Sequence, residues 1–263
     1  MELGASAKAA SYRLIVRDSV ASTNEDAMDL ARAGDPGWIW LVAREQKQGR
    51  GRRGRSWSSP PGNLYASLLL IDVAPPERLP ELGFVAALAL LKAVRAVLGD
   101  DPRLGIKWPN DILFDGAKLS GILLESTRLP NDTTACVAGL GVNCRSHPVT
   151  LPYAATDLAS IGTLLNAPED VLPRLSDAME EMLQIWNRGS GFAEIRSRWL
   201  ADALGRGQSI RVALGNADIS GIFETIDPYG RLILRDGMNA RAIEAGDVFL
   251  PSRSMTDQVV PST

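Results

Sequence analysis

Residues 106–125 read IKWPNDILFDGAKLSGILLE, and the turns in this stretch decide the fold class. Ile106–Trp108 is short and apolar enough for a strand, and Pro109 ends it because proline lacks the N–H that a sheet needs. Two more strands, 112–114 and 118–125, flank Asp115-Gly116, a dipeptide that favours a tight hairpin because both residues accept positive φ. Such hairpins, mixed with helices, exclude strict βαβ alternation, so we expect an α+β fold.

Further elements on both sides of this stretch follow from hydrophobic periodicity. Short apolar runs bounded by turn residues predict strands at 12–16, 38–43, 64–71 and 135–143. Helical spacing predicts helices at 22–34, 79–98, 171–186 and 192–200. Ser22 and Glu25 fit a capping box at the start of the first helix. These elements predict a mixed-sheet domain over residues 1–204.

After Gly205 the pattern changes to short strands separated by turns. The strands are expected at 209–213, 219–226, 232–234, 240–243 and 248–250. The turns are expected at Gly215-Asn216, Pro228-Tyr229-Gly230, Asp236-Gly237 and Gly246-Asp247. This regular spacing predicts a small closed β-barrel over residues 205–252, followed by a polar tail at 253–263.

The composition is that of a soluble globular protein. The 263 residues are 45% hydrophobic and 22% charged, with a net charge of −3, and four of the 28 Lys and Arg residues fall within 49–55. A duplex-binding protein would carry a broad basic face, so we expect no nucleic-acid partner. The amino terminus lacks the apolar run of a signal peptide, and the longest apolar stretch, 84–91, is too short for a bilayer. We therefore expect a cytoplasmic protein without membrane contact.

Cysteine and histidine are scarce, which limits the possible chemistry. Cys136 and Cys144 have no metal-ligand spacing and are expected to be buried thiols in a reducing compartment. His147, the single histidine, stands beside Pro148 and is interpreted as a surface residue. A Ser-His-Asp or Cys-His mechanism is therefore not expected.

The arginine-rich loop formally matches a dinucleotide fingerprint. Residues 49–54, GRGRRG, fit G-x-G-x-x-G, but residues 56–63, SWSSPPGN, cannot begin the helix that this motif requires, and no Walker-type Lys-Ser or Lys-Thr follows. What remains is a loop of backbone N–H groups and guanidinium groups suited to phosphate or carboxylate oxygens. A solvated basic loop is the alternative.

Other polar positions allow two interpretations each. Asn110 and Asp111 follow a strand break. They either project into a cleft, where Asp111 could bind magnesium or orient an arginine, or cap the backbone of their own turn. Lys118 is either a fixed ammonium for an anionic group or an edge charge. Ser22-Thr23-Asn24 is either functional or a helix cap. Glycines inside strands, which mark close approach of a ligand or backbone, occur at Gly121, Gly139 and Gly141.

In this order, the motifs resemble those of the biotin protein ligases over about residues 12–250. The resemblance is carried by Ser22-Thr23-Asn24, Gln46, Gly49–Arg55 with Trp57, Gly62–Tyr65 with Ser67, Lys107–Asp111, Lys118–Leu123 with Glu125, and Gly139–Asn143. It implies formation of biotinyl-5′-AMP from biotin and ATP with Mg²⁺, then transfer of biotin to a lysine of the apo form of a biotin carboxyl carrier protein. It also implies a catalytic domain followed by a small barrel.

The resemblance also implies roles for individual residues. Ser22, Thr23, Asn24 and Gln46 would line the biotin pocket. The loop of Gly49, Arg50, Gly51, Arg52 and Arg53 would close over biotin and phosphates, with Arg50 and Arg52 as its main contacts. Lys118 would meet the reacting carboxylate and α-phosphate, and Gly121 and Gly139 would pack on biotin. Arg55, Asn110 and Asn143 would serve ATP, and Asp111 is a candidate base for the carrier lysine.

The chain starts almost directly at the catalytic domain, so no winged DNA-binding domain and no operator binding are expected. Monomer and homodimer both remain open. A lipoate–protein ligase or octanoyltransferase of the same architecture is the nearest alternative, although no cysteine lies by the loop. A noncatalytic phosphate- or RNA-binding module is the alternative from another class, and it predicts steep salt dependence without ATP turnover.

Overall fold

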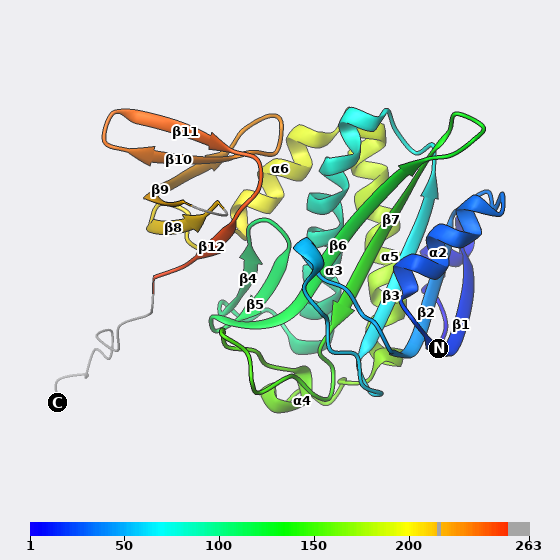
Figure 1. Cartoon of the computed structure of the whole chain (residues 1–263). Helices are drawn as coiled ribbons and strands as arrows, with labels where there is room; N and C mark the ends of the chain where they lie inside the picture. The colour runs from blue at the N-terminus through cyan, green and yellow to red at the C-terminus, as the bar shows by residue number, and fades with distance from the viewer. Residues whose placement is uncertain (215–216, 252–263) are drawn as a thin grey trace. The chain divides into compact units, whose positions relative to one another are not determined.

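The computed structural model describes residues 1–214 and 217–251 of the chain. The chain divides into two compact units, Met1–Ala203 and Leu204–Thr263. Each unit contains its own β-sheet (Figure 1). The turn predicted at Gly215-Asn216 and the tail predicted at 253–263 lie outside the described residues.

A seven-stranded mixed sheet forms the first unit, which confirms the predicted fold class. The strands are β1 (Arg13–Val20), β2 (Ile39–Gln46), β3 (Leu64–Ile71), β4 (Leu104–Lys107), β5 (Asp111–Phe114), β6 (Ala117–Arg128) and β7 (Thr134–Val142), in the order β1-β2-β3-β7-β6-β5-β4. Only β1 and β2 pair in parallel among these described strands. The predicted hairpin connects β5 and β6, and Asp115 and Gly116 both have positive φ there, at 49° and 80°.

Helices cover both faces of this sheet. Helix α2 (Thr23–Arg32) lies on one face, and α3 (Leu82–Leu98) and α5 (Pro168–Trp186) lie on the other (Figure 1). Helix α3 is buried almost all round because it packs against the sheet, α5 and α6 (Phe192–Ala201). The shorter segments are α1 (Ala5–Ala9), α4 (Leu158–Ile161) and the 3₁₀ turns η1 (Arg52–Gly54), η2 (Pro76–Glu81) and η3 (Asn187–Gly189).

Helix α2 is fixed on the sheet by a small apolar cluster. Its buried residues Ala27, Met28 and Ala31 pack against Ile39 of β2 and Leu69 of β3, among others. Fully burying a side chain of the size of Met or Leu stabilises a fold by roughly 1.5–3 kcal/mol. The cluster therefore holds the amino end of α2 at a fixed place over the centre of the sheet.

The start of α2 differs from the predicted capping box. Ser22 is the N-cap residue, but its side chain makes no capping hydrogen bond. The backbone N–H of Thr23 instead donates to Gln46 Oε1 at 2.8 Å, so a residue of β2 satisfies this helix end. The capping-box prediction was wrong because the acceptor comes from a distant part of the sequence.

The second unit is an antiparallel sheet of five strands. They are β8 (Ser209–Ala213), β9 (Asp218–Ile226), β10 (Leu232–Asp236), β11 (Asn239–Ile243) and β12 (Asp247–Phe249), in the order β11-β10-β9-β8-β12. Within the described residues β11 and β12 do not pair, so the expected barrel is not closed. The reason lies in the end strands: β12 has three residues, and all of β11 except Ile243 is exposed. These strands cannot form a buried seam.

Both cysteines are free and buried, as the sequence predicted. Burial raises the pKa of the Cys136 thiol and of the Cys144 thiol to about 12. A thiol with so high a pKa is almost entirely un-ionised at neutral pH and is a poor nucleophile. Among the described helices, none has both the length and the apolar character needed to span a bilayer.

Candidate active site

Five neutral side chains form a hydrogen-bonded chain where the amino end of α2 meets the sheet. We call Thr23, Asn24, Gln46, Ser59 and Ser67 the polar network. Gln46 Oε1 accepts from Thr23 Oγ1 at 3.0 Å, and Gln46 Nε2 donates to Ser59 Oγ at 2.9 Å. Ser67 Oγ lies 2.8 Å from Thr23 Oγ1 and 2.6 Å from Asn24 Oδ1. These bonds fix the orientation of each group before any ligand binds.

Glu125 of β6 ends this network with a charge. Asn24 Nδ2 donates to Glu125 Oε2 at 2.7 Å and to the carbonyl of Leu123 at 3.3 Å, which leaves Asn24 Oδ1 directed to Ser67. The other carboxylate oxygen of Glu125 lies 3.6 Å from a guanidinium nitrogen of Arg50. Glu125 therefore links the polar network to the arginine-rich loop.

Glycines on neighbouring strands form a floor beside the network, because the register pairs Gly121 of β6 with Gly141 of β7. A Cβ at Gly141 would lie 2.7 Å from the Trp57 ring, and a Cβ at Gly121 would lie 3.2 Å from it. A Cβ at Gly139 would come within 2.2 Å of Asn24 Oδ1. Only glycine allows these side chains to lie flat on the sheet.

The arginine-rich loop folds back on itself. Gly51 N–H donates to the carbonyl of Arg55 at 2.7 Å, and Trp57 N–H donates to the carbonyl of Gly49 at 2.8 Å. Between these two hydrogen bonds the loop contains the short η1 and no α-helix. This agrees with the expectation that the loop does not lead into a Rossmann-type helix. Arg52 Nη1 donates to Asn110 Oδ1 at 3.1 Å, which ties the loop to the break between β4 and β5.

Two lysines and one carboxylate lie at that break. Asp111 is only 8% exposed, and its two oxygens lie 2.7 Å from Lys118 Nζ and 3.3 Å from Lys107 Nζ. We call Arg50, Arg52, Lys107 and Lys118 the cationic cluster, which faces the carboxylates of Asp111 and Glu125. Two of these cations, Lys107 and Lys118, share the single carboxylate of Asp111, so the cluster favours an anionic ligand.

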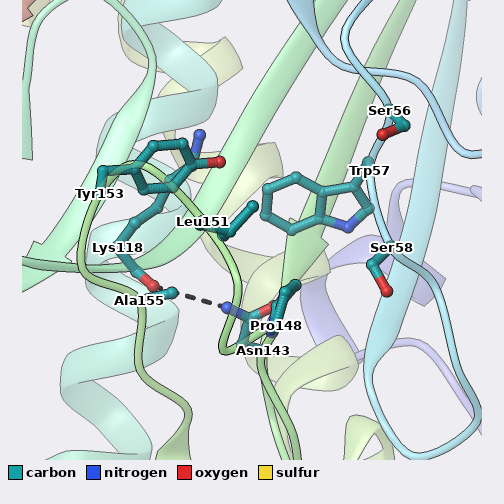
Figure 2. A pocket seen from close by; sticks show the side chains of 9 residues that line it. All are labelled: Ser56, Trp57, Ser58, Lys118, Asn143, Pro148, Leu151, Tyr153 and Ala155. Carbon is teal, nitrogen blue, oxygen red and sulfur yellow. Dashed lines mark hydrogen bonds between the residues drawn. The ribbon is translucent and has the colours of Figure 1, made fainter.

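A cavity that is open to solvent adjoins Lys118 (Figure 2). Lys118 Nζ lies 5.3 Å from the centre of the Trp57 ring and 5.6 Å from that of Tyr153, so two aromatic rings flank the ammonium. Burial, and the nearby charge of Asp111, raise the pKa of Tyr153. The full lining is Ser56, Trp57, Ser58, Lys118, Asn143, Pro148, Leu151, Tyr153 and Ala155.

The structure brings most of the predicted residues together, but not all in the expected way. The polar network contains Thr23, Asn24 and Gln46, whereas the side chain of Ser22 makes no capping bond. Arg53 and Arg55 are exposed on the loop. Asn143 lines the cavity, where its amide donates to the carbonyl of Thr156 at 3.0 Å.

His147, predicted as a surface residue, is partly exposed but also makes a buried contact. Its side chain is 24% exposed, and Nδ1 lies 2.5 Å from Asp157, whose side chain is 3% exposed. This pair could not be predicted from the sequence, because the residues are ten positions apart in an irregular segment. The sequence also predicts no individual role for Glu125, Ser67 or Tyr153. For Glu125, a lone carboxylate in an otherwise apolar strand was nevertheless a sign of a function.

The described residues contain no group of three or more His, Cys, Asp or Glu side chains that could hold a metal ion. Asp111, the carboxylate beside Lys118, already faces two ammonium groups.

Comparisons with known proteins agree with this geometry. Residues 18–143 match the biotin/lipoate A/B protein ligase family, and residues 206–250 match the biotin protein ligase C terminal domain. A biotin--[acetyl-CoA-carboxylase] ligase from Paracoccus denitrificans is 42% identical over 87% of this chain and 96% of its own length. The bifunctional ligase/repressor BirA of Bacillus subtilis is 31% identical over 90% of this chain and 74% of its own length.

A solved structure of similar fold is a biotin protein ligase from Aquifex aeolicus in complex with biotin and ATP. It superposes with a TM-score of 0.74 and 28% identity, covering 90% of this chain and 97% of the other.

Proposed function

Because the chain belongs to the biotin/lipoate A/B protein ligase family, we propose that it is an ATP-dependent biotin protein ligase. The observation that carries this proposal is the link, through Glu125, between a neutral polar network and a cationic cluster beside one glycine floor. The first suits an uncharged ring system with hydrogen-bonding groups, and the second suits a carboxylate and phosphates. Biotin and ATP together present these features.

The polar network is proposed to bind the ureido ring of biotin. Thr23, Asn24 and Gln46 would exchange some of their mutual hydrogen bonds for bonds to the ligand, with Ser22 at the edge of the pocket. Gly121 and Gly139 would receive the ureido ring, since neither has a side chain to exclude it. The Trp57 ring now lies on this floor, so it would shift to admit the ligand and would then cover it.

The cationic cluster is proposed to bring two anions into contact. Lys118 would meet the biotin carboxylate and the α-phosphate, while Gly49, Arg50, Gly51, Arg52 and Arg53 close over them. Arg55, Asn110 and Asn143 would contact the nucleotide. Each preorganised donor of this kind typically contributes about 3–4 kcal/mol to transition-state stabilisation. Asp111 would fix Lys118 through their 2.7 Å ion pair.

In the first step a biotin carboxylate oxygen attacks the α-phosphorus of ATP, the bond to pyrophosphate breaks, and biotinyl-5′-AMP forms. No general base is needed because the nucleophile is already ionised. In the second step the amine of the carrier lysine attacks the acyl carbon, AMP leaves, and the nitrogen loses a proton. Asp111, whose carboxylate lies 2.7 Å from Lys118 Nζ, is the proposed acceptor of that proton.

Magnesium is proposed to arrive with ATP as part of the substrate. The acceptor is proposed to be the apo form of a biotin carboxyl carrier protein, and the place of action the cytoplasm, where ATP is available. We assign catalysis to residues 1–204. An octanoyltransferase is disfavoured because both thiols are buried with a pKa of about 12.

The proposal is tested by incubating the purified protein with ATP, magnesium, biotin and an apo carrier domain. We expect the carrier to gain the mass of one biotinyl group on one lysine, and pyrophosphate to be released with biotin alone. A carrier with that lysine changed to arginine is the matched control, and lipoate in place of biotin tests the nearest alternative. Absence of pyrophosphate release with biotin would refute the proposed function.

A further inference from the structure

The segment from His147 to Asp157, which we call the strap, forms one side of the cavity. Four of its residues, Pro148, Leu151, Tyr153 and Ala155, line the cavity together with Trp57 (Figure 2). The strap leaves β7 shortly after Asn143 and ends at the first turn of α4. Its position thus decides the width of the cavity on the side opposite Trp57.

The backbone is firmly held just before the strap and within its C-terminal end. Asn63 Oδ1 accepts from the backbone N–H groups of Cys144, Arg145 and Ser146. At the other end, Lys118 N–H donates to the carbonyl of Ala154, and Thr156 N–H donates to the carbonyl of Lys118. The strap is therefore attached to β6 at the residue that carries the central ammonium.

The part between these attachments has little support of its own. In the portion of the chain that the structure describes, no hydrogen bond involves residues 148–153. Pro148 and Pro152 lack an N–H group altogether. The bond between His147 Nδ1 and Asp157 Oδ2, at 2.5 Å, joins the first residue of the strap to the last. It is the side-chain contact that closes the strap into a loop of fixed width.

Asp157 is suited to anchor this contact. Its side chain is 3% exposed, and its second oxygen accepts from the backbone N–H of Ser160 at 2.6 Å, so Asp157 also caps α4. A buried carboxylate that loses a hydrogen-bond partner raises the free energy of the folded state, so the bonds of Asp157 to His147 and to Ser160 both stay formed. His147 is thereby bonded to the N-cap residue of α4.

We propose that His147 is a positioning residue for the nucleotide, acting through Asp157 to hold the strap at the width that ATP requires. This inference rests on the proposed function, because it takes the cavity beside Lys118 and Asn143 as the nucleotide half of the site. His147 does not contact the nucleotide. Its bond sets where Leu151 and Tyr153 stand relative to Trp57.

Two substitutions at His147 distinguish loss of the hydrogen bond to Asp157 from loss of the imidazole ring. In His147→Asn the amide nitrogen takes the place of Nδ1, two bonds from Cβ, and can still donate to Asp157. In His147→Gln the amide nitrogen takes the place of Nε2 and does not reach. Val149→Ala is the matched strap control, because Val149 is 87% exposed and does not line the cavity.

The measurement is the Kd of ATP with magnesium by titration calorimetry on the full chain, followed by the KM values for ATP and biotin. Loss of one hydrogen bond to a charged group should weaken ATP binding about tenfold in His147→Gln and His147→Ala. His147→Asn and Val149→Ala should stay within about twofold of the unchanged protein, and the KM for biotin should not move.

Unchanged ATP affinity in His147→Gln would overturn the inference, as would equal shifts in the KM values for ATP and biotin. If His147→Ala fails to fold, the comparison of His147→Asn with His147→Gln still decides the question. A protein that binds ATP but releases no pyrophosphate with biotin would refute the proposed function alone, since the calorimetry does not depend on turnover.

Discussion

The polar network and the cationic cluster share one face of one sheet, but they are built in different ways. In the network each buried amide or hydroxyl already has a partner, from Ser59 through Gln46 and Thr23 to Ser67 and Asn24. In the cluster, two lysines share the single carboxylate of Asp111. A neutral ligand that binds at the network must therefore replace hydrogen bonds that already exist between its side chains. An anionic ligand that binds at the cluster instead supplies negative charge that the cluster lacks.

This difference predicts which measurable properties depend on the polar network and which depend on the cationic cluster. A change in the network should affect folding stability and biotin affinity together, because it leaves buried polar groups without partners. A change in the cluster should affect the rate of reaction with little loss of stability. The following three variants test that separation, in order of decreasing effect.

Lys118→Ala should slow adenylate formation about 10²–10³-fold, as expected for the loss of one preorganised donor to developing negative charge. The melting temperature should change little, because Lys107 remains 3.3 Å from Asp111. Single-turnover release of pyrophosphate measures the first effect, and thermal melting measures the second. Lys92→Ala, which removes an exposed ion pair with Glu181, is the control. A wild-type single-turnover rate in Lys118→Ala would contradict the assigned role.

Gly139→Ala should raise the KM for biotin roughly 10–100-fold and also lower stability, by about 1–3 kcal/mol. The new methyl group would lie 2.2 Å from Asn24 Oδ1, so Asn24 must move and its bonds to Ser67 and Glu125 must break. Urea unfolding and steady-state kinetics report the two effects. Gly83→Ala is the control, since the added methyl group would meet no atom outside its own part of α3, and alanine there should only favour the helix. An increase in KM without loss of stability would show that the network is not interlocked.

Arg52→Ala should increase escape of biotinyl-5′-AMP into solution about tenfold, because one charge-assisted contact is lost. The bond from Arg52 to Asn110 ties the loop to the sheet, so the loop would also lose an attachment. The free adenylate can be measured by mass spectrometry after rapid filtration. Arg128→Ala, which removes an exposed pair with Asp132, is the control. Equal retention in both variants would exclude the clamp function of Arg52.

The parts of the fold that sequence predicts well are those that depend on neighbouring residues. The Asp115-Gly116 hairpin and the unbroken apolar helix around 79–98 follow from local turn chemistry and periodicity. The capping box failed because Gln46, 23 residues after Thr23 in sequence, supplies the acceptor. Barrel closure failed because pairing of end strands depends on burial, which the short β12 and the exposed β11 do not provide.

The site shows the same division. The arginine-rich loop and the strand glycines were visible as unusual residue types. The bond between His147 and Asp157 and the contact of Glu125 with Asn24 were not visible, since neither spacing nor residue type distinguishes them from solvated groups. A position such as Glu125, where a charge interrupts an apolar strand, can be marked from sequence, but its partner 101 residues away cannot.

The glycine floor imposes an asymmetry on how this site can change. Gly121, Gly139 and Gly141 already have the smallest side chain, so every substitution on the floor narrows the space above it. Room for a larger acid or a modified ring can be gained only from the opposite side, at Trp57 or along the strap. Attempts to broaden substrate range should therefore begin at the cover of the site, and attempts to exclude a substrate should begin at its floor.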